Sequence, residues 1–176
     1  MVSKLFRFPE VINETSARVV ASGVVAQSVL FMAVREWWVL VPLAYGFVAR
    51  VLFGPRFSPL AQAAIRVVTP KVESVIGRSG RIVPGPPKRF AQGIGVVFSV
   101  SALVAAVLGS TPAAVGIILG LAVAASLEAF AGFCLGCVVF AQLMKFGVIP
   151  ESVCVECSDI SQRLAIGEQR ELALSR

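Results

Sequence analysis

Apolar residues along this chain gather into four long runs that short polar segments separate. A helix needs about 20 apolar residues to cross the ~30 Å hydrocarbon core of a bilayer. The pattern therefore predicts four transmembrane helices, at approximately 19–34, 37–53, 90–109 and 113–142. We expect an all-α, polytopic membrane protein in which residues 1–176 form a single membrane domain, built on a four-helix transmembrane bundle.

The segment 54–89, between the second and third runs, is basic: it contains seven Lys and Arg residues and one acid, Glu73. Because basic loops stay on the cytoplasmic side, we place this loop, both termini and the tail 143–176 in the cytoplasm. The prolines of the loop predict an interfacial helical segment that ends in a stiff Pro-Gly-Pro-Pro turn at 84–87. Two roles are open for it, attachment to anionic lipid by charge and direct binding of a ligand. The tail predicts a short C-terminal helix at 158–174.

The composition supports a membrane protein and excludes chemistry that depends on histidine. The chain is 57% hydrophobic and 15% charged, and its mean hydropathy is +0.85, which is far more apolar than a soluble domain of this length. The net charge of +6 follows from the basic loop, so it does not indicate nucleic-acid binding. Because the chain has no histidine, Ser-His, Cys-His and His-metal chemistry are excluded.

The four cysteines form two Cys-x-x-Cys pairs, and the first pair interrupts the fourth apolar run. Three interpretations are open: dithiol redox chemistry, a zinc or iron-sulfur site, and inert buried cysteines. The metal site would use all four thiolates, those of Cys134, Cys137, Cys154 and Cys157. The apolar neighbours of the first pair and the acidic neighbours of the second do not favour a reactive thiolate, unless the fold brings Lys145 or a loop arginine close.

Glu128 is the one acid within the apolar runs, and a carboxylate at that depth is costly unless it is paired or faces a wet cavity. It is a candidate functional residue, and a structural pairing with Arg50 is the alternative. On a continuous helix Glu128 points away from Cys134 and Cys137, so proton exchange with either thiol requires a kink near Gly132 or Gly136. Two Gly-x-x-x-Gly spacings, Gly116 with Gly120 and Gly132 with Gly136, predict close helix packing within the bundle.

The stretches Glu128-Ala-Phe-Ala-Gly-Phe-Cys-Leu-Gly-Cys137, Pro150-Glu-Ser-Val-Cys-Val-Glu-Cys157, Pro55-Arg-Phe-Ser-Pro-Leu60 and Pro86-Pro-Lys-Arg-Phe-Ala91 resemble the bacterial DUF4395 membrane family. The resemblance covers most of the chain. It implies a small protein of the bacterial cytoplasmic (inner) membrane and assigns no reaction. It also implies a thioredoxin-like or sulfurtransferase partner, and it highlights Glu128, Gly132, Cys134, Gly136 and Cys137, with Cys154 and Cys157 after them.

We therefore expect a membrane-embedded thiol or sulfur-redox protein whose cytoplasm-facing Cys-x-x-Cys pairs act with that soluble partner. Cys134, Cys137 and Glu128 are the predicted reactive residues. One alternative is a non-enzymatic scaffold, or a subunit of a larger membrane complex, whose four cysteines bind zinc or an iron-sulfur cluster. Another is a transporter of a small sulfur species, which Glu128 and the glycines inside the bundle suggest.

Overall fold

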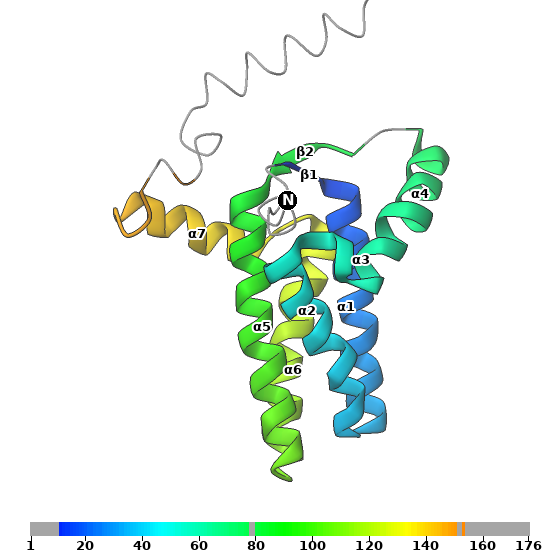
Figure 1. Ribbon diagram of the computed structural model, residues 1–176, viewed down its shortest axis with the longest axis vertical. Coiled ribbons are helices and arrows are strands. Elements are labelled where there is room, and N and C mark those ends of the chain that lie inside the picture. The colour runs from blue at the N-terminus through cyan, green and yellow to red at the C-terminus, as the bar shows by residue number, and fades with distance from the viewer. Residues whose placement is uncertain (1–10, 78–79, 151–152, 154–176) are drawn as a thin grey trace, which may run out of the picture.

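The computed structural model describes residues 11–77, 80–150 and 153, and most of them are helical (Figure 1). In chain order the elements are β1 (Val11–Asn13), α1 (Glu14–Val34), η2 (Trp37–Val39), α2 (Leu40–Phe53), η3 (Gly54–Phe57), α3 (Pro59–Ala63), η4 (Ala64–Val68), α4 (Thr69–Ile76), β2 (Ile82–Pro84), α5 (Gly85–Val107), α6 (Thr111–Ser126), η5 (Leu127–Ala131) and α7 (Leu135–Lys145). Of the η segments, η2 and η3 are 3₁₀ turns, whereas η4 and η5 are π-helical.

Four of the described helices are long and apolar enough to cross a membrane, at Glu14–Val34, Trp37–Phe57, Gly85–Val107 and Thr111–Ala131. The predicted all-α fold with four membrane-crossing helices is thus confirmed. The predicted C-terminal helix at 158–174 lies outside the described residues.

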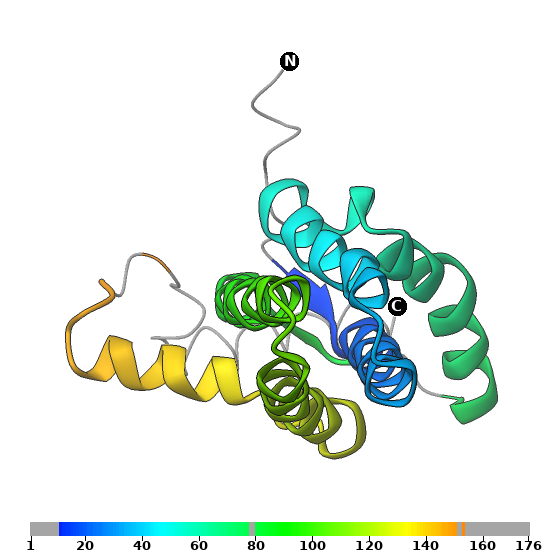
Figure 2. The same cartoon turned by 90° about the horizontal axis from the view of Figure 1, so that it is seen from below.

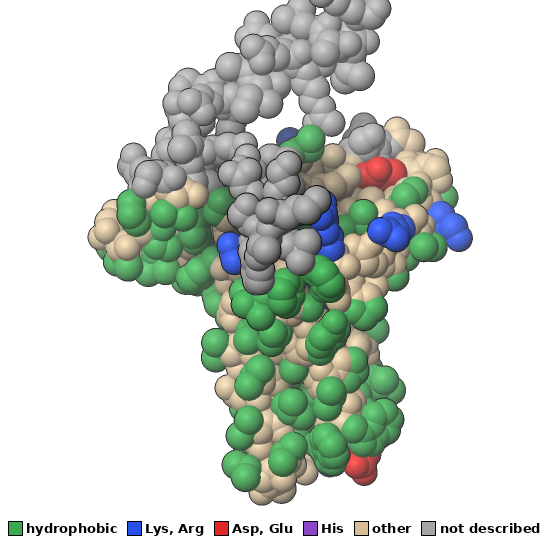
Figure 3. Space-filling model, in the orientation of Figure 1, with side chains coloured by type: hydrophobic (Ala, Val, Ile, Leu, Met, Phe, Trp, Pro, Cys, Tyr) green, Lys and Arg blue, Asp and Glu red, His purple; other side chains and the backbone are tan. Residues whose placement is uncertain are grey.

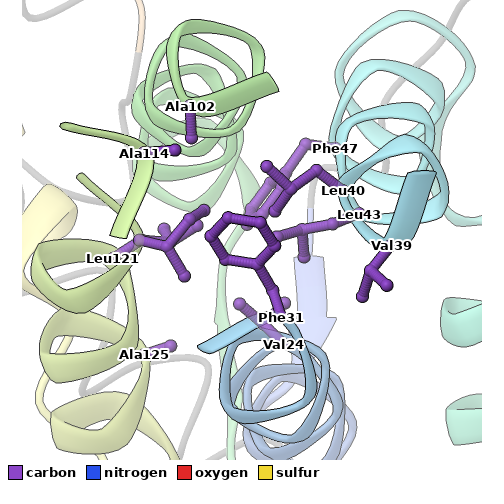
Figure 4. Close-up of a cluster of buried hydrophobic side chains, with 11 residues drawn as sticks. Val24, Phe31, Val39, Leu40, Leu43, Phe47, Ala102, Ala114, Leu121 and Ala125 are labelled. Atoms are coloured by element: carbon purple, nitrogen blue, oxygen red, sulfur yellow. The ribbon is translucent and has the colours of Figure 1, made fainter. Parts of the chain in front are cut away.

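The four long helices stand side by side, and Figure 2 shows them end-on. Their core is apolar: Phe31 of α1 is fully buried among Leu40 and Leu43 of α2 and Leu121 of α6, and α5 contributes Ala102 (Figure 4). Fully burying a side chain such as Phe or Leu stabilises a fold in water by about 1.5–3 kcal/mol. In lipid, close packing between the helices takes over much of this role, and small core residues permit it.

The outer surface of the bundle is apolar along the helices and basic at one end. Hydrophobic side chains cover the lower part of the face in Figure 3, whereas Lys and Arg side chains gather near the upper end. Exposed apolar residues such as Val97, Val104 and Val123 point outward from the helices, as expected for contact with lipid. Arg35 and Glu36 lie in the turn between α1 and α2, at the opposite end.

A short ribbon of β1 and β2 joins the beginnings of α1 and α5. The strands are antiparallel, with Ile12 opposite Val83. Asn13 then caps α1 by accepting hydrogen bonds from the backbone N–H groups of Thr15 and Ser16, at 2.8 and 3.4 Å. Because each strand leads directly into a helix, the ribbon fixes the first turns of α1 and α5 at the same level. No sequence pattern had indicated these strands.

Three predicted boundaries need correction. The segment 84–87 is not a free turn: Pro84 precedes α5 and the next three residues form its first turn, because proline is well suited to the first positions of a helix. The third span therefore begins at Gly85 rather than near residue 90. The fourth run, expected as one helix over 113–142, is divided into α6 with η5 and a separate α7.

The basic loop is helical, as predicted, but it has its own anchors. The segment α3 with η4 packs against α1, where Leu60 lies against Gly23. Further along, Glu73 of α4 accepts hydrogen bonds from the Asn13 side chain and the Gly80 N–H, at 2.8 and 2.7 Å. The hydrogen bond from Gly80, and next that from Asn13, lower the pKa of Glu73. The loop is thereby tied to the beginning of α1.

Candidate functional site

The candidate site forms where the fourth apolar run breaks. The π-helical turn η5 ends at Gly132, which has a φ of +68°, a conformation that glycine adopts without strain. The N–H groups of Gly132 and Phe133 bond to the carbonyls of Glu128 and Leu127, both at 3.1 Å, and close the helix end. The kink that proton exchange between Glu128 and either thiol would require, near Gly132 or Gly136, thus exists at Gly132.

Arg18, on the first turns of α1, stabilises this break from the side. Its Nε donates to the carbonyl of Ala129 at 3.2 Å, and its Nη2 donates to that of Phe130 at 2.7 Å. These carbonyls belong to the last turn of η5, where intrahelical partners run out. A salt bridge with Glu14 at 3.9 Å accompanies these contacts. Sequence reasoning missed Arg18, because its partners lie more than one hundred residues away along the chain.

After the break, the chain resumes as α7, which leaves the end of the bundle sideways (Figures 1 and 2). Gly136 allows this helix to approach α5, since a Cβ atom at Gly136 would lie only 2.5 Å from the Cβ of Ala91. The prediction of close packing thus holds for Gly136. It does not hold for Gly116, where a Cβ would meet nothing within 4 Å.

Cys134 is the N-cap residue of α7 and does not lie within one continuous helix, as the long fourth apolar run had predicted. Its backbone is extended, and its Sγ accepts a hydrogen bond from the N–H of Cys137 at 3.3 Å. A sulfur atom here occupies the position that Ser or Asp oxygen atoms usually take at a helix start. Because the N-terminus of a helix favours negative charge, this position stabilises a thiolate.

The two thiols of the pair differ in their acidity. A hydrogen bond from the Cys137 thiol lowers the pKa of Cys134 against the opposing effects of burial and of the Glu128 charge, and the charge of Lys88 adds to the lowering. Donating that hydrogen bond, together with burial, raises the pKa of Cys137. Both cysteines are free thiols, Cys134 buried and Cys137 half-buried. Cys134 is therefore the first thiolate of the pair.

Lys88, on the first turn of α5, is a cation whose charge acts on both thiols of this pair, whereas the sequence had suggested Lys145 or a loop arginine for this role. Lys88 forms a salt bridge and hydrogen bond with Glu128. The two side chains are 10% and 18% exposed, so the pair is largely shielded from water. The alternative partner suggested for Glu128, Arg50, instead donates to Gln92 at 2.8 Å and to Ser58 at 3.2 Å.

An apolar cavity of about 310 Å³ extends from the site into the bundle. Small and apolar residues of α1, α2, α5, α6 and α7 line most of it, while Glu128 and Cys134 are among its lining residues. A thiol there faces a space of low polarity rather than bulk water. The geometry thus combines a half-buried dithiol, a shielded ion pair and an apolar chamber.

The structure brings Cys134 and Cys137 together with Lys88 and places Glu128 against Lys88. Cys154 and Cys157 lie outside the described residues. Within the ranges that the structure describes, no group of three or more His, Cys, Asp or Glu side chains is placed to hold a metal ion. Lys88 was not predicted as a site residue, although it belongs to the Pro86-Pro-Lys-Arg-Phe-Ala91 motif.

Comparison with known proteins gives one match. Residues 12–145 match the model of a family described as "Domain of unknown function (DUF4395)". This match spans α1 to α7 and includes Glu128 and the first cysteine pair. No curated protein and no solved structure matches the chain.

Proposed function

Because the chain belongs to the DUF4395 family, for which no function is assigned, we propose its function from the candidate site. The protein is a membrane-embedded dithiol that exchanges electrons or sulfur with a soluble thioredoxin-like or sulfurtransferase partner. The observation that carries this proposal is the position of Cys134. It is the N-cap of α7, it accepts the N–H and thiol hydrogen bonds of Cys137, and Lys88 lies nearby.

In the proposed exchange, the thiolate of Cys134 attacks a disulfide of the partner. A mixed disulfide forms, the partner's sulfur–sulfur bond breaks, and the first partner thiolate leaves and takes up a proton. Cys137 then loses its proton and attacks the sulfur of Cys134. A Cys134–Cys137 disulfide forms, and the second partner thiol is released. The protein loses two electrons, and the partner's disulfide gains them.

Transfer of sulfur uses the same nucleophile. The Cys134 thiolate attacks the outer sulfur of a partner persulfide, a Cys134 persulfide forms, and the partner leaves as a thiolate. In either reaction Lys88 acts through its charge on the Cys134 sulfur, and Glu128 is a positioning residue that holds Lys88. The raised pKa of Cys137 keeps its thiol protonated until the first bond has formed.

The orientation that fits this proposal places the site at the cytoplasmic face of a bacterial inner membrane. The site lies at the same end of the bundle as the described basic residues of α3 to α5, whereas Arg35 lies at the opposite end. The positive-inside rule favours the cytoplasm for the more basic end. A soluble partner would approach the pair there from the side of Cys137, which is half-buried, to reach the buried Cys134.

The test uses protein with Cys154→Ser and Cys157→Ser, so that only the first pair reacts. A single-cysteine thioredoxin, whose reactive sulfur carries thionitrobenzoate, serves as the partner, and release of the coloured thiolate gives the rate. We expect the Cys137→Ser variant, which retains Cys134, to react at pH 7 more than about tenfold faster than the matched Cys134→Ser variant. Equal rates, or rates no faster than those of an unfolded thiol peptide, contradict the proposal.

A further inference from the structure

A second cavity lies at the same end of the bundle and has a different character. It measures about 220 Å³ and lies between the first turns of α1, the end of α2, the loop helices and α5. Since a water molecule takes up about 30 Å³ of the liquid, the space is large enough for a small solvated group. Arg50 and Lys88 line it, and none of the described lining residues is an Asp or a Glu.

Arg50 contributes a buried positive charge to the lining of this cavity. It is only 4% exposed, which is rare for an arginine unless it is paired. Its Nε donates to Gln92, its Nη1 donates to Ser58, and its guanidinium carbon lies 4.5 Å from the centre of the Phe47 ring. Nη2 is buried and has no hydrogen-bond partner among the described residues. A buried donor of this kind is costly unless an acceptor reaches it.

Neutral hydrogen-bond donors also line the cavity. Gln92 is held by its amide oxygen, which accepts from Arg50, so its amide nitrogen is left to donate. Ser16 accepts a hydrogen bond from the hydroxyl of Thr69 at 3.1 Å, and its own O–H is available to another acceptor. Both residues line the cavity. The lining therefore offers two cations and neutral donors to one small space.

We propose that this cavity binds an oxyanion, either a free tetrahedral anion or the phosphate of an anionic lipid headgroup. Arginine presents several N–H groups in a planar fork that matches phosphate and related oxyanions, and such charge-assisted hydrogen bonds are strong. Among the described residues, the salt bridge of Glu128 is with Lys88, and the charge of Glu128 acts on Arg50 without a salt bridge between them. The bound anion supplies the acceptor that Nη2 of Arg50 lacks among the described residues. The site does not depend on the reactivity of the cysteines.

The experiment uses the full chain purified in dodecyl maltoside, a detergent without charge. In one arm, sodium sulfate and sodium phosphate are titrated by calorimetry at fixed chloride concentration. In the other, native mass spectrometry measures retention of phosphatidylglycerol, with diacylglycerol as the control lipid that lacks phosphate. Saturable binding in the first arm alone identifies a free oxyanion, and retention of phosphatidylglycerol identifies a lipid headgroup. Either result supports the site.

Three variants make the test specific. Arg50→Gln should weaken binding roughly 10- to 100-fold, because a charged donor is lost. Ile65→Trp, which adds volume at the cavity lining and keeps both cations, should likewise weaken binding. If Arg50→Gln does not fold, this variant takes its place, and unchanged binding by folded Ile65→Trp then overturns the proposal. Arg56→Gln, an exposed residue near the end of α2, should bind as the wild type does. Absence of saturable binding by the wild type, or unchanged binding by folded Arg50→Gln, overturns the proposal.

Discussion

The salt bridge between Lys88 and Glu128 allows a quantitative test of how the site is held. Lys88→Met leaves the Glu128 carboxylate without its partner, in a place where that side chain is 18% exposed. Removing one partner of a buried pair typically costs about 3–5 kcal/mol, because the remaining charge stays desolvated. Folded proteins are stable by only about 5–15 kcal/mol, so this one change should remove a large part of the stability.

A double-mutant cycle isolates the interaction. We expect Lys88→Met combined with Glu128→Gln to recover most of the loss, since no uncompensated charge is left. The assay is reversible unfolding, in which sodium dodecyl sulfate is titrated into dodecyl maltoside micelles and helix content is followed by circular dichroism. Lys145→Met, a change of the same kind at an exposed position of α7, is the matched control. If Lys88→Met costs less than about 1 kcal/mol, the value of a solvent-exposed pair, the reasoning is refuted.

Three further predictions concern the surroundings of the pair. Cys137→Ala removes the thiol hydrogen bond and should raise the pKa of Cys134. The pH profile of Cys134 alkylation by iodoacetamide, measured by mass spectrometry, should therefore move to higher pH. An unchanged profile would contradict the thiol contact. Gly136→Ala should force α7 away from α5 and destabilise the fold by about 1–3 kcal/mol. Gly116→Ala, at a position with free space for a Cβ atom, should be neutral or stabilising in the same unfolding assay. Equal effects of the two changes would contradict close packing at Gly136. Arg18→Ala should cost about 0.5–1.5 kcal/mol, the net value of a hydrogen bond that water can partly replace, because its carbonyl acceptors at the end of η5 are exposed or only partly buried. Stability equal to that of the wild type would contradict a stabilising role for Arg18.

The transmembrane helices were predictable because their signal is local. A run of about 20 apolar residues is a sufficient condition for a membrane-crossing helix, and no distant contact is needed to recognise it. The break in the fourth run was only partly predictable. Gly132 marks a place where a kink is expected, but the sequence does not show that Arg18 caps the carbonyls there or that α7 turns aside.

The electrostatics of the site were not predictable from sequence neighbours. The residues adjacent to Cys134 in the sequence are apolar, and taken alone they do not favour a reactive thiolate. The nearby cation is Lys88, at the beginning of α5. The β1–β2 ribbon and the packing of Gly136 on Ala91 fix the positions of α1, α5 and α7 relative to one another. Arg50 was the partner suggested for Glu128, but its described hydrogen bonds go to Gln92, 42 residues along the chain, and to Ser58.

The most direct test of the central claim is a redox titration of the first cysteine pair. Protein with Cys154→Ser and Cys157→Ser is equilibrated in buffers of reduced and oxidised dithiothreitol, and peptide mass spectrometry quantifies the Cys134–Cys137 disulfide. We expect this disulfide to form and to be reduced reversibly in a single two-electron transition, and reduced thioredoxin to reduce it as well. Failure of an intramolecular disulfide to form under oxidising conditions, or its resistance to thioredoxin, would contradict the account.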